Sequence, residues 1–200
     1  MRQIAILALV AALGAGCAIA RPIEEEEEEN DIAVISASVQ IRRAPGGRDR
    51  IAEVTPKAEF GELLRVLDLL SLSRVKRVKV VVEGGGPTVL VSLVWPKTTQ
   101  PRLGVSVNKG GFGVHAAPLA QLRKGHSGLL EPKPSLAPLE NGQPAWDLLI
   151  AAVKAQLAAV ERLNAVVILA APESDAITVL ETAQRVGALG FSEGVFLAPW

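Results

Sequence analysis

The side chains that could carry out chemistry are few in this sequence and widely spaced. His126 and Ser127 could serve a hydrolase as base and nucleophile, together with any aspartate. Adjacent residues on one loop cannot adopt that geometry with each other, however, and the chain holds no Gly-x-Ser-x-Gly turn. A single cysteine excludes a thiolate metal cage, and two histidines make a histidine-rich metal site implausible. These residue types predict a protein that is not an enzyme and has no metal or cofactor.

Other patterns that resemble functional motifs have simpler structural explanations. The glycines at 84–86 and 110–111 lack the lysine and the following helix of a phosphate-binding loop, so we expect turns there. Glu173 and Asp175 precede a predicted helix, where negative charge complements the helix dipole. We expect His115 to be a half-buried structural residue on a strand.

Two basic clusters are the remaining candidates for an interaction surface. The first comprises Arg42, Arg43, Arg48 and Arg50, and the second comprises Arg74, Lys76, Arg77 and Lys79. Either cluster could meet an anionic glycan, a lipid surface or glutamates of the same chain. A solvated sheet edge that discourages aggregation is the alternative. Because strand side chains alternate, Arg74 and Lys76 can share a face that Arg77 cannot.

The composition limits the classes of partner. The chain has 200 residues, of which 49% are hydrophobic but only 4% aromatic, and tyrosine is absent. Base stacking on aromatic platforms is therefore an improbable way to bind nucleic acid. The formal net charge is zero, so the charge balance does not point to a polyanion partner either.

The N-terminal residues are typical of an exported protein. Residues 1–17 combine Arg2, an apolar run of about ten residues and small residues before Cys17, which is the layout of a secretory signal. The run is about half of what a membrane-spanning helix needs. Cys17 follows the small residues directly, as in a bacterial lipoprotein signal. We therefore expect lipidation of Cys17. Ala18 rather than an aspartate follows it, which by resemblance to lipoproteins of double-membrane bacteria implies the outer membrane facing the periplasm, with plain secretion to the periplasm as the alternative.

A solvated segment follows, and then a first folded region. Residues 18–30 contain Glu24–Glu29, and six like charges in a row predict a flexible tether. In residues 31–98 we expect a strand over 32–41, a loop over 42–50, and a helix capped by Thr55 with Pro56 in its first turn. Its apolar face is Phe60, Leu63, Leu64, Leu67 and Leu70. Strands over 75–83 and 88–95 around three glycines predict a hairpin.

Residues 99–200 predict a second region with the order β-β-α-β-α-β. Two short strands flank a turn at residues 108–111, and a Pro-rich irregular loop occupies residues 117–144. The apolar periodicity then predicts a helix over 146–160, a central strand over 165–171, a helix closed by Gly187 or Gly190, and a strand over 194–198. Helices returning to one sheet imply an α+β, two-layer sandwich with the helices on one face.

This order and its apolar segments resemble the periplasmic domain of the ExbD/TolR family of biopolymer transport proteins, over about residues 93–198. The opening hairpin is LGVSVNKGGFGV. The family's penultimate strand is matched by Val166, Val167, Ile168 and Ala170, and its last helix by Val179, Leu180 and Ala183. The end of that helix is matched by Gly187 or Gly190 with Phe191. The resemblance implies envelope partners such as an ExbB/TolQ-like proton channel, a TonB-like protein or peptidoglycan, and a homodimer.

One departure from the family restricts what the resemblance implies. The tetrapeptide ending Val54-Thr55-Pro56 echoes the family's membrane segment, and Asp68 lies downstream, but the residues between them carry charges that are costly within a bilayer. We therefore expect a solvated Asp68 with no proton-carrying role. The sequence predicts a non-catalytic envelope lipoprotein accessory to transport driven by proton-motive force or to envelope maintenance. The alternative is a glycan- or small-substrate-binding lipoprotein that uses the Pro-rich loop.

Overall fold

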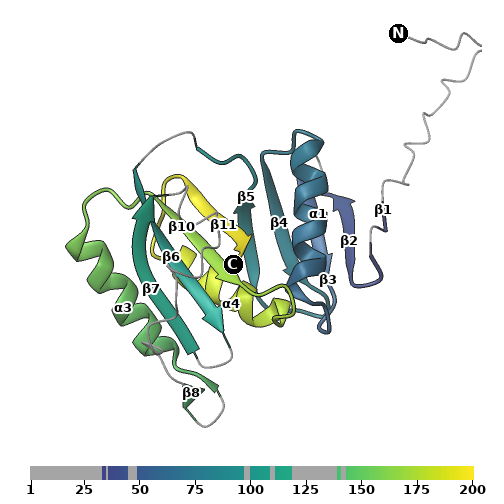
Figure 1. Ribbon diagram of the computed structural model, residues 1–200. Helices are drawn as coiled ribbons and strands as arrows, with labels where there is room; N and C mark the ends of the chain where they lie inside the picture. Colours follow the sequence, from purple (N-terminus) through teal and green to yellow (C-terminus); the bar gives the residue numbers. More distant parts are fainter. Residues whose placement is uncertain are drawn as a thin grey trace, which may run out of the picture. The chain divides into compact units, whose positions relative to one another are not determined.

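The protein combines a long mixed sheet with helices that pack against it. The computed structural model describes residues 33–34, 36–44, 49–96, 100–108, 111–118, 139–140 and 143–200. In these ranges nine strands form one sheet, with the order β1-β2-β3-β4-β5-β11-β10-β6-β7 (Figure 1). The α+β class is as predicted. The two regions expected from the sequence, 31–98 and 99–200, share this sheet, because β5 of the first region lies beside β11 of the second.

The first strands differ from the sequence prediction in two places. The elements are β1 (Ala33–Val34), β2 (Val39–Arg43) and β3 (Arg50–Val54). The single strand predicted over 32–41 is wrong, because Ser36 Oγ accepts hydrogen bonds from the Ser38 and Val39 N–H groups and turns the chain, so that β1 and β2 pair antiparallel. The loop predicted over 42–50 is too long, since Arg42, Arg43 and Arg50 belong to strands.

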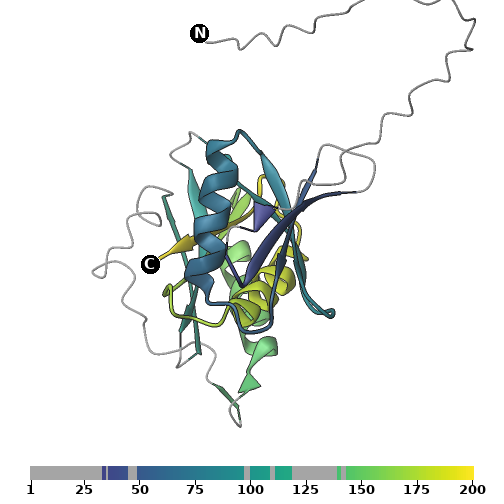
Figure 2. The same cartoon turned by 90° about the vertical axis from the view of Figure 1, so that its right-hand side faces the viewer.

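Helix α1 (Phe60–Leu72) begins later than predicted. The Ala58 N–H donates to the Thr55 carbonyl at 3.1 Å, so Thr55 and Pro56 lie in a separate turn rather than at the helix cap. The helix starts where Glu62 Oε2 can accept from the Glu59 N–H, at 3.2 Å. Four residues of the predicted apolar face are buried, namely Phe60, Leu63, Leu67 and Leu70. Val66, which was not predicted, is buried with them, and the predicted Leu64 is only partly buried. In the view from the β2 end of the sheet, α1 lies nearer to the viewer than the helices and strands of the second half of the chain (Figure 2).

The predicted hairpin after α1 is confirmed. Strands β4 (Arg77–Val82) and β5 (Thr88–Ser92) pair antiparallel. Gly84, Gly85 and Gly86 between them all have positive φ, which residues with a side chain rarely adopt. β5 ends at Ser92, three residues before the predicted end.

The second half has the predicted order and places both its helices on one face. Its elements are β6 (Pro101–Asn108), β7 (Gly111–Pro118), α3 (Trp146–Ala159), β10 (Ala165–Ala170), α4 (Ala176–Gly187) and β11 (Gly194–Pro199), with a separate small hairpin of β8 (Leu139–Glu140) and β9 (Gln143–Pro144). The Trp146 ring of α3 contacts Phe112 of β7 at 5.3 Å between centroids and lies under the Arg185 guanidinium of α4. Most of the predicted Pro-rich loop falls outside the described residues.

The central strand β10 is buried on both faces. Val166, Ile168 and Ala170 join the core beneath the helices. Val167 and Leu169 point to the opposite face, where Phe196 of β11 packs against Trp95 with 4.7 Å between ring centroids. This explains why residues 165–170 form a continuous apolar run rather than an alternating one.

None of the helices in the described ranges is both long and apolar enough to cross a membrane. Helix α1, which contains Asp68, has 13 residues and exposes Asp68 on its surface. The solvated position predicted for Asp68 is therefore confirmed.

Candidate functional site

A cleft of about 340 Å³ lies where the two halves of the sheet meet. One wall is the edge of β5 from Thr88 to Ser92, and the other is the C-terminal end of α4 with the turn that leads into β11. Its lining includes Arg77 on β4 and Gln184 on α4. Polar side chains and the edge of a strand therefore line the same cleft.

The cleft exists because β5 and β11 hardly pair. β11 is in register with β10 along its whole length, from Gly194 to Pro199, and β5 is in register with β4 in the same way. Between β5 and β11, by contrast, Val91 and Val195 are the one register pair found within the described ranges. The portion of β5 before Val91 therefore borders the cleft instead of a neighbouring strand.

The backbone of β5 points polar groups toward this boundary. The Leu93 N–H donates to the Lys76 carbonyl at 2.9 Å, so the backbone groups of Leu93 point toward β4. N–H and C=O groups alternate between the two edges of a strand, which directs those of Val91 and Val89 to β4 as well. The groups of Thr88 and Leu90 are consequently directed to the opposite edge, where the Leu90 carbonyl faces Val195 of β11 and the Leu90 N–H and both Thr88 groups border the cleft.

Small residues allow α4 and the β11 turn to approach closely. A Cβ added at Gly187 would lie 2.9 Å from Val195 Cγ2, so the Val195 side chain would have to shift to admit it. A Cβ added at Gly194 would collide with Ser92 Oγ, and Gly194 also has φ of +102°. Gly194 therefore requires glycine, because residues with a side chain rarely adopt its positive φ.

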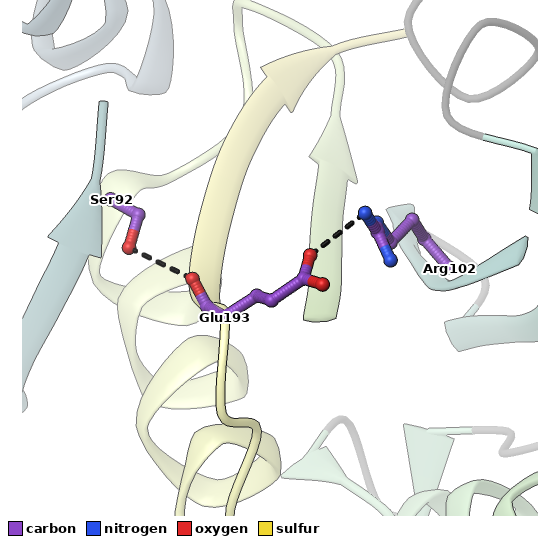
Figure 3. A network of polar contacts seen from close by, with 3 residues as sticks. All are labelled: Ser92, Arg102 and Glu193. Carbon is purple, nitrogen blue, oxygen red and sulfur yellow. Dashed lines mark hydrogen bonds and ion pairs between the residues drawn. The ribbon is translucent and has the colours of Figure 1, made fainter. Parts of the chain in front are cut away.

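A network of polar contacts fixes the start of β11 (Figure 3). Glu193 Oε2 lies 2.7 Å from Arg102 Nη2 of β6, and the Glu193 carbonyl accepts a weaker hydrogen bond from Ser92 Oγ of β5 at 3.4 Å. The Glu193 N–H donates to the Asn164 carbonyl at 2.8 Å. The Arg102 side chain is completely buried, and that of Glu193 is 28% exposed. One residue thus ties β11 to β5 on one side and to β6 on the other.

The residues of the two predicted basic clusters do not form one surface in the structure. Arg42 of β2 and Lys79 of β4 lie on one sheet face, since both are in register with Ile51, and Arg42 forms an ion pair with Glu53 at 3.3 Å. Arg43 and Arg50 are opposite each other in the β2–β3 register and belong to the other face. Arg74 and Lys76 are exposed between α1 and β4, whereas Arg48 and Cys17 lie outside the described residues. Arg77, which belongs to the second basic cluster but was not expected to share a face with Arg74 and Lys76, lines the cleft.

The other candidates of the sequence have structural roles or were not described. The Asp175 carboxylate caps α4 by accepting from the Thr178 N–H at 2.9 Å, which confirms the predicted contribution to the helix start. His115 on β7 is half-buried as predicted, and burial lowers its pKa below 6.5. His126 and Ser127 fall outside the described residues.

Arg102, Glu193 and Ser92 were not predicted from the sequence. Arg102 is the one charged residue in the segment PRLGVSV, residues 101–107. A charge on a central strand needs a partner, so this position could have indicated a buried ion pair. Its partner lies 91 positions later, so the pairing itself has no local signal. Among the described residues, no cluster of His, Cys, Asp and Glu suited to a metal ion occurs.

Comparisons with protein-family models, with curated proteins and with solved structures found no match to this chain.

Proposed function

We propose that this chain is a non-catalytic lipoprotein of the cell envelope whose domain binds an envelope partner. In this proposal it is an accessory of transport driven by proton-motive force, or of envelope maintenance, and its partner is an ExbB/TolQ-like channel subunit, a TonB-like protein or the cell wall. Lipidated Cys17 anchors it in the outer membrane, and the acidic residues 24–29 act as a solvated spacer.

The observation that carries the proposal is the arrangement of the second half of the sheet. The hairpin β6–β7 is followed by α3, β10, α4 and β11, with β10 between β6 and β11 and both helices on one face. This is the order and layering that the resemblance to ExbD/TolR domains implies. The cleft beside β5 supports a binding role, because its lining presents backbone and side-chain polar groups at a concave surface.

Site-specific crosslinking in cells tests this function. A photoreactive amino acid is placed at Gln184, which lines the cleft, or at Leu72 of α1, which is 81% exposed and does not line it. We expect position 184 to crosslink to a channel subunit or a TonB-like protein, identified by mass spectrometry, and position 72 to give little product.

A different result distinguishes the competing function. Retention of the purified protein on peptidoglycan, without any protein crosslinked in cells, would favour a glycan-binding lipoprotein. Crosslinks only to cytoplasmic proteins would refute an envelope role.

A further inference from the structure

We propose that the cleft binds an extended acidic peptide segment, which adds to the edge of β5 as a short strand. The inference rests on the proposed binding role and names the chemistry of the partner at this site. It depends on three features of the described residues: the direction of the β5 backbone, the shape of the cleft and the charge at its rim.

The β5 edge offers the hydrogen bonds that an added strand requires. Thr88 directs its N–H and C=O groups toward the cleft and Leu90 directs its N–H there, whereas the Leu90 carbonyl faces Val195 in the single pairing of β5 with β11. Backbone N–H and C=O groups strongly favour hydrogen-bonded partners, and a peptide in extended conformation provides both kinds. Addition of a strand to an exposed sheet edge is an established mode of peptide recognition.

The shape of the cleft suits a short stretch of chain. The edge from Thr88 to Leu90 is three residues long, or about 10 Å at the usual rise per residue. The volume of about 340 Å³ lies at the lower end of the range for ligand pockets. Ala183, Gly187 and Ala188 form the opposite wall with little side-chain bulk, so a peptide backbone can approach α4.

The rim selects a negatively charged segment. Arg77 lines the cleft, and Lys79, two residues along β4, shares its face and is also exposed. Lys79 is in register with Leu90, which is 54% exposed, so an apolar side chain stands beside the two cations. A peptide with alternating small apolar residues and a carboxylate at one end complements both features. A planar lipid surface cannot enter a concave site of this kind.

The test measures binding of three fluorescein-labelled peptides by fluorescence anisotropy. The first is the heptapeptide Ser-Val-Ser-Val-Ser-Glu-Glu, the second replaces both glutamates with lysine, and the third carries the first sequence with N-methyl groups on alternate residues. We expect the first to bind, the second to bind about tenfold more weakly because like charges oppose it, and the third to lose binding because its donors are blocked.

Variants of the protein locate the site. Gln184→Trp fills the cleft from an exposed position and should abolish binding, and Leu90→Pro removes an N–H that faces the cleft and should weaken binding about tenfold. Arg77→Glu should reverse the preference between the glutamate and lysine peptides. Lys76→Glu is the matched control, because it changes the same charge one residue away without lining the cleft. Circular dichroism and thermal unfolding verify that each variant is folded.

The outcomes separate this inference from the proposed function. Equal binding of the N-methylated peptide, or unchanged binding by a folded Gln184→Trp protein, overturns strand addition at the cleft. If the peptides fail while crosslinks to envelope proteins persist, the cleft assignment is wrong and the proposed function stands. If the peptides bind as expected but no envelope protein is crosslinked, the cleft is a peptide site and the proposed envelope role is wrong.

Discussion

The ion pair between Arg102 and Glu193 predicts unequal costs for removing its two partners. The Arg102 side chain is fully buried, so Glu193→Gln leaves a whole positive charge in the interior. Breaking a buried pair in this way costs about 3–5 kcal/mol, and because the glutamine amide oxygen can still accept a hydrogen bond we expect about 3 kcal/mol. Arg102→Met leaves a carboxylate that is 28% exposed and can be hydrated, so we expect a loss of about 1–2 kcal/mol.

Urea unfolding followed by tryptophan fluorescence measures these differences. The double variant Arg102→Met/Glu193→Gln should unfold close to the single Arg102→Met variant, because both charges are removed together. The exposed pair of Arg42 and Glu53 is the matched control, since its side chains are 44% and 33% exposed and removing either should cost less than about 1 kcal/mol. A larger loss for Arg102→Met than for Glu193→Gln would refute the reasoning from burial.

Four further predictions follow from the sequence and the structure. Val167→Asp places a carboxylate at a fully buried site and should abolish the cooperative thermal transition, whereas a transition like that of the wild type would contradict a core position. Burial lowers the pKa of His115 below 6.5, so as the pH falls through 6.5 the unfolded chain binds a proton before the folded chain does. The free energy of unfolding should therefore fall as the pH drops from 6.5, and it should fall less in His115→Gln. Urea unfolding at several pH values measures this difference. Cys17→Ala should eliminate labelling by a clickable fatty acid, and equal labelling of both proteins would disprove lipidation. Asp68→Asn should change stability by no more than about 0.5 kcal/mol and complement a deletion strain, while a normally abundant variant that fails to complement would revive a proton-carrying role.

Local sequence patterns were sufficient to predict an element where the residues of that element alone indicate its structure. The run AVVILA is apolar on both faces because β10 has strands on both sides, the core beneath the helices on one face, and a side-chain cluster with Trp95 and Trp200 on the other. Its composition alone predicts a central strand. The glycines at 84–86 predicted the β4–β5 turn for an equally local reason, since all three adopt positive φ.

The same patterns failed where a short polar contact or a neighbouring strand decides the structure. β3 was missed because Arg50 and Glu53 interrupt its apolar pattern, yet its pairing with β2 and β4 supplies the backbone hydrogen bonds that make it a strand. The turn that divides β1 from β2 depends on one serine hydroxyl, and serine is common in strands and turns alike.

The cleft could not be predicted from the sequence, because it arises from the order of strands rather than from any one of them. β5 and β11 are more than 100 residues apart along the chain, and their pairing is confined to Val91 and Val195. Gly194 allows this approach only because it has no side chain to strike Ser92, while Glu193 fixes the same turn to β6 through Arg102. Extending the β5–β11 pairing would fill the cleft with the protein's own backbone. The ion pair is therefore expected to matter for binding as well as for stability, because it holds β11 at the position where the β5 edge remains accessible.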